Sequence, residues 1–209
     1  MFKESFTKNT LDSMSRKTYE ILEIEYAFKR HKNTINLVFA VFLVTFVLSY
    51  VFIYYNILEF RHFGNLIYEA FKLKIEDFSI SDKSSLDLII LILKNNLFVA
   101  LFTYVIMFFA LINIALNSYL LAYVLYVTEP LKFGLLILPH GIFEIPALIL
   151  SGSSAIILFK SVILKFKKDI RYKEFFLDSL RIFGVSVLLF IIAAVIEVLV
   201  TYNIALNIV

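Results

Sequence analysis

The sequence predicts an all-α membrane protein that crosses the bilayer about five times. Of its 209 residues, 61% are hydrophobic and only 18% are charged, and this composition is too apolar for a soluble globular domain. Several apolar segments are also near 20 residues long. That length, at 1.5 Å per residue, crosses a hydrocarbon core of about 30 Å as a helix.

The first 35 residues form a polar leader ahead of the first apolar segment. The leader is expected to be helical and carries seven basic residues: Lys3, Lys8, Arg16, Lys17, Lys29, Arg30 and Lys32. It fits an amphipathic helix on the cytoplasmic membrane surface, and equally a solvated charged helix that precedes a span. Because 35 polar residues come first, the following apolar segment is unlike a cleavable secretory signal and should be retained as an anchor.

The membrane domain, residues 36–209, contains four apolar segments. Residues 36–58 have no charge over 23 positions and form the first span. Residues 86–127 are 42 residues long, which is too long for one span and suits two, at about 86–108 and 111–128. The remaining spans are predicted at about 134–159 and 182–204, and a basic loop, 160–181, joins them.

Charge placement sets the expected orientation, since basic residues near span ends favour the cytoplasm. The leader and the 160–181 loop are the two basic regions. Both can be cytoplasmic only if an even number of crossings separates them, so residues 86–127 must cross twice. The sequence therefore predicts a multi-pass cell-membrane protein with its N-terminus inside and its C-terminus outside.

Ionisable residues inside the predicted spans mark the candidate site. His140 and Glu144 are four residues apart and therefore share one helix face. Glu197 follows the start of the last span by about 24 Å, which places it in the same outer half of the membrane. Asn95 and Asn96 are expected at that depth too. Such residues are costly in a bilayer and indicate either a functional site or polar contacts between helices.

Three interpretations of this cluster remain open from the residues alone. Hydrogen bonds between helices, each worth about 0.6 to 2 kcal/mol in membranes, are favoured. A proton or solute path is the second, and a metal site of one histidine and two carboxylates is the third. A sealed cluster would favour the first interpretation, and a water-accessible cavity reaching Glu144 would favour the second. We expect no stoichiometric metal and no cofactor.

Prolines and small residues predict the packing around the cluster. Pro139 is expected at the start of the fourth span, and Pro146 should kink that span because it lacks an N–H. The small residues 151–155, with Gly152 among them, should let another helix approach closely, with Ala193 and Ala194 as the expected neighbours. Packing within one chain is favoured over a homodimer surface.

Several functional classes receive no support. The chain has no cysteine, which excludes disulfides and thiolate chemistry. Its 20 basic residues nearly balance 17 acidic ones, so no basic stripe predicts nucleic-acid binding. No serine elbow, phosphate loop or zinc-protease histidine pair is present. A metal-dependent membrane hydrolase would have to use the one cluster.

The cluster residues lie in a pattern that resembles the stage II sporulation protein M family of integral membrane proteins. The resemblance covers roughly residues 86–205 and rests on Asn95-Asn96, Asn117, Pro139-His140-Gly141, Glu144, Pro146-Ala147, and Ala193-Ala194 with Glu197. It adds Asn117 to the cluster. Tyr104, Phe108 and Phe109 depart from it, since the family often has small residues there.

This resemblance implies a non-enzymatic scaffold. The sporulation member works with membrane-anchored partners, one of them a peptidoglycan hydrolase, and relatives occur in organisms that never sporulate. We therefore expect a scaffold subunit of an envelope-associated complex that contacts lipids and other membrane or envelope proteins. A transporter or permease-like subunit that uses His140, Glu144 and Glu197 is the alternative.

Overall fold

A computed structural model describes the backbone of residues 2–77 and 84–204, which is helical and contains no strand. The helices are α1 (Phe2–Tyr54), α2 (Phe60–Asp77), α3 (Ser85–Val105), α4 (Ala110–Val127), α5 (Pro130–Phe166) and α6 (Tyr172–Ile196). Short 3-10 turns occur at Ile57–Glu59 and Met107–Phe109, and a π-helical turn follows α6 at Glu197–Thr201. Five helical segments are long and apolar enough to cross a membrane, as predicted. The all-α, multi-span fold class is thus confirmed.

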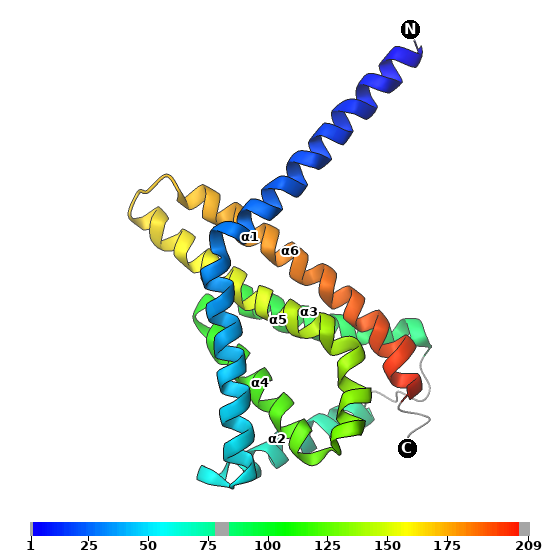
Figure 1. Cartoon of the computed structure of the whole chain (residues 1–209), viewed down its shortest axis with the longest axis vertical. Helices are drawn as coiled ribbons and strands as arrows, with labels where there is room; N and C mark the ends of the chain where they lie inside the picture. Colours follow the sequence, from blue (N-terminus) through cyan, green and yellow to red (C-terminus); the bar gives the residue numbers. More distant parts are fainter. Residues whose placement is uncertain (1, 78–83, 205–209) are drawn as a thin grey trace.

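The polar leader and the first span are one helix. α1 continues without a break through the predicted boundary at residue 35, and its N-terminal part projects away from the bundle (Figure 1). His31 and Thr34 are already buried, so contact with the bundle begins before the expected span. The position of the leader on a membrane surface stays a prediction.

α5 and α6 form an antiparallel hairpin, and α5 also packs against α1, α3 and α4 (Figure 1). Ser161 Oγ donates a hydrogen bond to the carbonyl of Tyr172, and Ser186 Oγ donates one to the carbonyl of Ala147. The predicted loop 160–181 is mostly helix, and only residues 167–171 are not helical. Within this turn Arg171 binds Asp169 and holds the pKa of that carboxyl at about 2.

α3 and α4 are joined by the turn at Met107–Phe109, and each packs on a different side of the bundle. Tyr104 of α3 stacks on Phe183 with ring centroids 4.4 Å apart, and its hydroxyl lies 2.9 Å from Ser179 Oγ of α6. Ser118 Oγ of α4 donates to the carbonyl of Phe42 in α1. Tyr104 therefore fills the space between α3 and α6.

α2 packs against one end of α4. Tyr119 donates a hydrogen bond to the carbonyl of Phe60, and Tyr123 contacts Asn65. A Cβ at Gly64 would overlap the ring of Tyr123, so this close approach requires glycine. Arg61 donates hydrogen bonds to the carbonyls of Ile53 and Tyr54 in the last turn of α1, where carbonyl groups lack the N–H groups of a following helical turn.

The connections between the helices lie at two opposite ends of the bundle. Phe108, in the α3–α4 turn, packs on Phe159 near the end of α5, and Arg30 of α1 binds Asp178 near the start of α6. α2, the α4–α5 connection and the π-helical turn after α6 lie toward the other end. The helices alternate in direction accordingly.

The structure corrects two packing predictions. α5 begins at Pro130, so Pro139 lies inside the helix and does not start it. α5 bends sharply in its first half, and both internal prolines, Pro139 and Pro146, are part of this helix (Figure 1). Helix formation extends to Pro130 because proline at the first turn loses no helical hydrogen bond.

The small residues 151–155 are all buried within one chain, but Ala193 and Ala194 are not their neighbours. A Cβ at Gly152 would lie 2.9 Å from Ile114 of α4 and 3.5 Å from Val38 of α1. The Ser186–Ala147 and Thr201–His140 contacts instead place Ala193 and Ala194 beside residues 140–147. The small residues thus let α5 approach α1 and α4.

Candidate intramembrane polar site

His140 and Glu144 lie one turn apart on α5 and point to the same side. His140 Nε2 is 3.7 Å from Glu144 Oε2. His140 is buried, whereas the Glu144 side chain is 34% exposed. Their spacing of four residues produces this arrangement, because such residues are neighbours on an α-helix.

The π-helical turn at Glu197–Thr201 brings two further side chains to His140. Thr201 Oγ1 lies 3.1 Å from His140 Nδ1. One ligand atom each from His140, Glu144 and Glu197 lies within 4.8 Å of the other two. π-helical turns often occur at functional sites, and here the turn follows α6 where that helix faces α5.

The three predicted asparagines lie around the same site, but in different ways. The Asn96 side chain of α3 interacts with the carboxyl group of Glu144. Asn95 and Asn117 line the cavity beside it. The Asn117 amide donates to the side chain of Asn113, which in turn donates to Thr103 Oγ1 at 2.6 Å and thereby links α4 to α3.

A cavity of about 400 Å³ adjoins these residues. His140, Glu144 and the three asparagines form part of its wall, and its volume is typical of small-ligand sites. Ile67 and Tyr68 of α2 also line the cavity. Phe42, Leu148 and Phe190 close it on the side of the hydrophobic core. The cluster is therefore not sealed.

The site contains acidic groups that no lysine or arginine among the described residues of the cavity wall balances. Two carboxyl groups and one imidazole meet here, and the cavity walls in the described part of the chain include no lysine or arginine. Two ionised carboxylates this close in a low-dielectric site need a proton or a cation between them. The site is suited to bind one.

Acyl-transfer chemistry has less support. Thr201, His140 and Glu144 are arranged in space like the nucleophile, the base and the orienting acid of a catalytic triad. Thr201, however, is buried and is not among the residues that line the cavity. A substrate in the cavity would not meet its hydroxyl.

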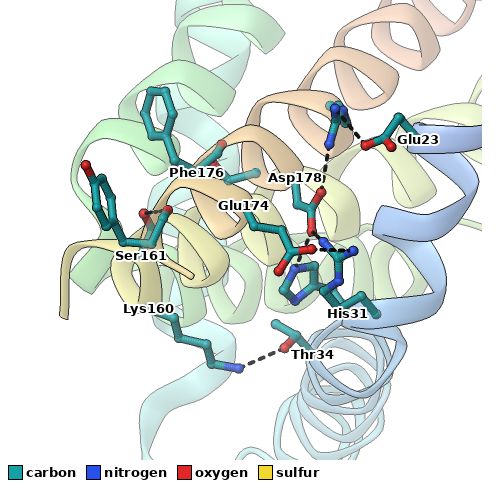
Figure 2. A network of polar contacts seen from close by, with 12 residues as sticks. Glu23, His31, Thr34, Lys160, Ser161, Glu174, Phe176 and Asp178 are labelled. Carbon is teal, nitrogen blue, oxygen red and sulfur yellow. Dashed lines mark hydrogen bonds and ion pairs between the residues drawn. The ribbon is translucent and has the colours of Figure 1, made fainter. Parts of the chain in front are cut away.

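A second polar network, around Asp178, was not predicted from the sequence (Figure 2). Asp178 is 1% exposed, and its carboxylate lies 2.5 Å from Arg30 Nη1, 3.1 Å from His31 Nε2 and 3.1 Å from Arg181 Nη1. Glu174 binds Arg30 and Glu23 binds Arg181 on the outside of this group. The network joins α1 to α6.

His31 lies within the first 35 residues, which the sequence predicts as a polar leader, and Asp178 lies within the predicted basic loop 160–181. The spacing of Glu174, Asp178 and Arg181 at three and four residues is the signal that could have revealed a charged helix face. Nearby, Lys160 of α5 donates to Thr34 Oγ1 of α1 at 2.9 Å, so α5 is tied to α1 as well.

The fold and the site define a multi-span, all-α membrane protein with a polar cavity between its helices. The family model described as "Stage II sporulation protein M" matches residues 38–202, and the chain therefore belongs to this family. All six residues of the predicted cluster fall within the match. The resemblance seen in the sequence is confirmed.

A relative from Methanocaldococcus jannaschii supports the same assignment. This uncharacterized protein is 34% identical to the chain over an alignment of 211 positions, which covers 97% of each protein. No solved structure matches the chain.

Proposed function

We propose that this protein is a permease-like membrane subunit that binds a small cationic or protonated solute in the cavity beside Glu144. The main observation in support of this proposal is that the cavity reaches Glu144, whose side chain is one-third exposed. This is the feature expected of a solute path and not of a sealed set of hydrogen bonds. The proposal thus favours the alternative over the scaffold interpretation.

The lining of the cavity supports a positively charged solute. Carboxyl groups and amide oxygens are available as acceptors from Glu144, Asn95, Asn96 and Asn117. An anion would find no fixed positive charge among the described lining residues, so its desolvation would not be compensated. A cation would instead relieve the repulsion between Glu144 and Glu197.

The orientation is part of the proposal. Basic residues gather at the end that contains the α5–α6 turn, including Lys165, Lys167, Lys168, Arg171 and Lys173. The positive-inside rule places this end in the cytoplasm, with the N-terminus. The C-terminus and α2 are then outside, and the cavity lies in the outer half of the cell membrane. Its closed side, at Leu148 and Phe190, faces the cytoplasm.

A scaffold subunit is the second candidate. It is supported by the N-terminal part of α1, which projects away from the bundle as a long helix (Figure 1). This part of the helix is therefore accessible to another protein. Under this proposal the chain holds other membrane or envelope proteins together, and the cluster only stabilises the fold.

Water access to the cavity distinguishes the two proposals. The chain has no cysteine, so single cysteines can be placed at Asn117, which lines the cavity, and at its neighbour Leu116, which is exposed on the bundle surface at the same depth. Thiol reagents react with the ionised thiolate, which forms in water and not in lipid.

An impermeant methanethiosulfonate reagent, added to intact cells, should therefore label Asn117→Cys and leave Leu116→Cys unlabelled. If neither cysteine reacts in protein that is present in the membrane, the cavity is not open to water. The permease-like function would then be rejected in favour of the scaffold.

A further inference from the structure

We propose that His140, Glu144 and Glu197 bind a divalent transition-metal cation reversibly, and that this cation is the solute of the cavity. The inference rests on the proposed function and names its solute class. It differs from a resident cofactor site because the ion is expected to enter and leave.

The positions of the ligand atoms are close to those of a metal site. Tetrahedral ligands at bond lengths of about 2.0 to 2.2 Å lie about 3.4 Å from one another. His140 Nε2 and Glu144 Oε2 are already 3.7 Å apart, and no pair in the group of three exceeds 4.8 Å. The separations therefore have to shorten only slightly for all three atoms to bind one ion, and glutamate side chains are flexible enough to supply this movement.

Contacts behind the ligands orient them toward a common point. Thr201 Oγ1 holds His140 Nδ1, and this leaves Nε2 on the side of Glu144. The Asn96 side chain interacts with the carboxyl group of Glu144 from the neighbouring helix α3. Metal-binding histidines usually have such a partner on the second ring nitrogen, which fixes the ring and the position of its proton. This support is the second observation that points to an ion, besides the cluster itself.

The ligand set selects the class of cation. Ca²⁺ takes six to eight oxygen ligands and Mg²⁺ favours octahedral oxygen, whereas an imidazole nitrogen suits Zn²⁺ and related transition metals. A neutral imidazole and two carboxylates carry two negative charges, which a divalent ion neutralises. A monovalent ion or a single proton leaves one charge uncompensated.

The access route makes the binding reversible. Three protein ligands leave the fourth position of a tetrahedral site open, as in sites that exchange their ligand. That position faces the cavity, since His140 and Glu144 both line it. An ion can therefore reach the site through water and leave in the same way.

Zinc binding by the purified full-length protein in detergent tests the inference. Zn²⁺ alone is titrated against a chromophoric zinc indicator, with the parent, His140→Ala and Glu197→Gln compared. Glu129→Gln is the matched control, because Glu129 is exposed and is not among the residues that line the cavity. We expect one saturable site per chain in the parent and the control, and a loss of affinity of at least about tenfold in both cluster variants. A large excess of Mg²⁺ should not displace the zinc.

The thermal midpoint provides a second readout in case a variant folds poorly. A ligand that binds only the folded state raises the midpoint, so Zn²⁺ should stabilise the parent and Glu129→Gln. No saturable zinc site in the parent, or unchanged binding in His140→Ala, would overturn the inference. Labelling of Asn117→Cys without zinc binding would reject the cation and keep the cavity, whereas absent labelling would reject the proposed function itself.

Discussion

Arg30 of α1 and Asp178 of α6 form an ion pair of 2.5 Å across 148 residues of sequence. Asp178 is nearly inaccessible to solvent, and His31 and Arg181 also contact its carboxylate. A buried carboxylate is tolerated only when it is paired and hydrogen-bonded, and here α1 supplies two of the three partners. The end of the leader is thereby fixed to the α5–α6 hairpin.

Asp178→Leu should destabilise the protein because it leaves Arg30, His31 and Arg181 without their common partner. Breaking a fully buried pair costs about 3 to 5 kcal/mol, and the partial exposure of both arginines lowers our expectation to about 2 to 4 kcal/mol. Unfolding in detergent measures the loss. Glu25→Gln, in the exposed Glu25–Lys29 pair, is the control and should unfold like the parent. Equal stability of both variants would contradict a structural role for the network.

The polar cluster should also contribute to stability. Glu144→Leu removes the partner of Asn96 and His140, and Glu197→Leu removes the second carboxyl of the group. Leaving a partner unsatisfied costs about 1 to 3 kcal/mol. Glu144→Gln keeps the shape and the hydrogen-bonding capacity, so its effect should be far smaller. A Glu144→Leu protein with the thermal stability of the parent would show that these contacts do not hold the helices together.

The tight contact at Gly152 makes a third prediction. Gly152→Ala places a Cβ 2.9 Å from Ile114, and overpacking of a core costs about 1 to 3 kcal/mol. Gly184→Ala, at a helical position with nothing within 4 Å of the added carbon, should be neutral or slightly stabilising. Comparison of the two unfolding midpoints in detergent separates packing from helix propensity. Shortening the opposing side chain, with Ile114→Val, should restore part of the lost stability.

Much of the fold follows from the sequence because a membrane imposes simple rules. The length of the apolar segments and the parity of the basic regions require two helices in residues 86–127, and the structure has α3 and α4 there. The spacing of His140 and Glu144 is enough to place them on one face. The number of residues between the start of the last span and Glu197 is enough to predict that Glu197 lies at the same membrane depth as His140 and Glu144.

The cavity and the Asp178 network could not be predicted in this way. The cavity depends on how α2, α3, α4 and α5 pack together, and no periodicity of a single segment reports that packing. The π-helical turn that orients Glu197 and Thr201 has no clear sequence signal. Charged residues at a span end usually contact solvent, and only the folded chain shows that Asp178 is buried between α1 and α6.

The membrane orientation is the fourth prediction. Lys167→Cys lies in the α5–α6 turn and should be cytoplasmic, because the basic residues around it favour that side. An impermeant thiol reagent should label it only after the cells are opened. A cysteine at Leu58, an exposed residue in the turn before α2, should react in intact cells. The reverse pattern would invert the topology, and labelling of both from outside would contradict the alternating crossings.

The last prediction separates a transient cation from a resident one. Protein purified without added metal should contain much less than one transition metal per chain, because the site is open to the cavity and has only three protein ligands. A structural or catalytic metal would instead be retained through purification, since closed or fully supported sites release their ion slowly. Elemental analysis of the parent and of His140→Ala measures the difference. One tightly held zinc per chain in the parent, lost in His140→Ala, would contradict the reversible site and make a metal-dependent membrane hydrolase the leading interpretation.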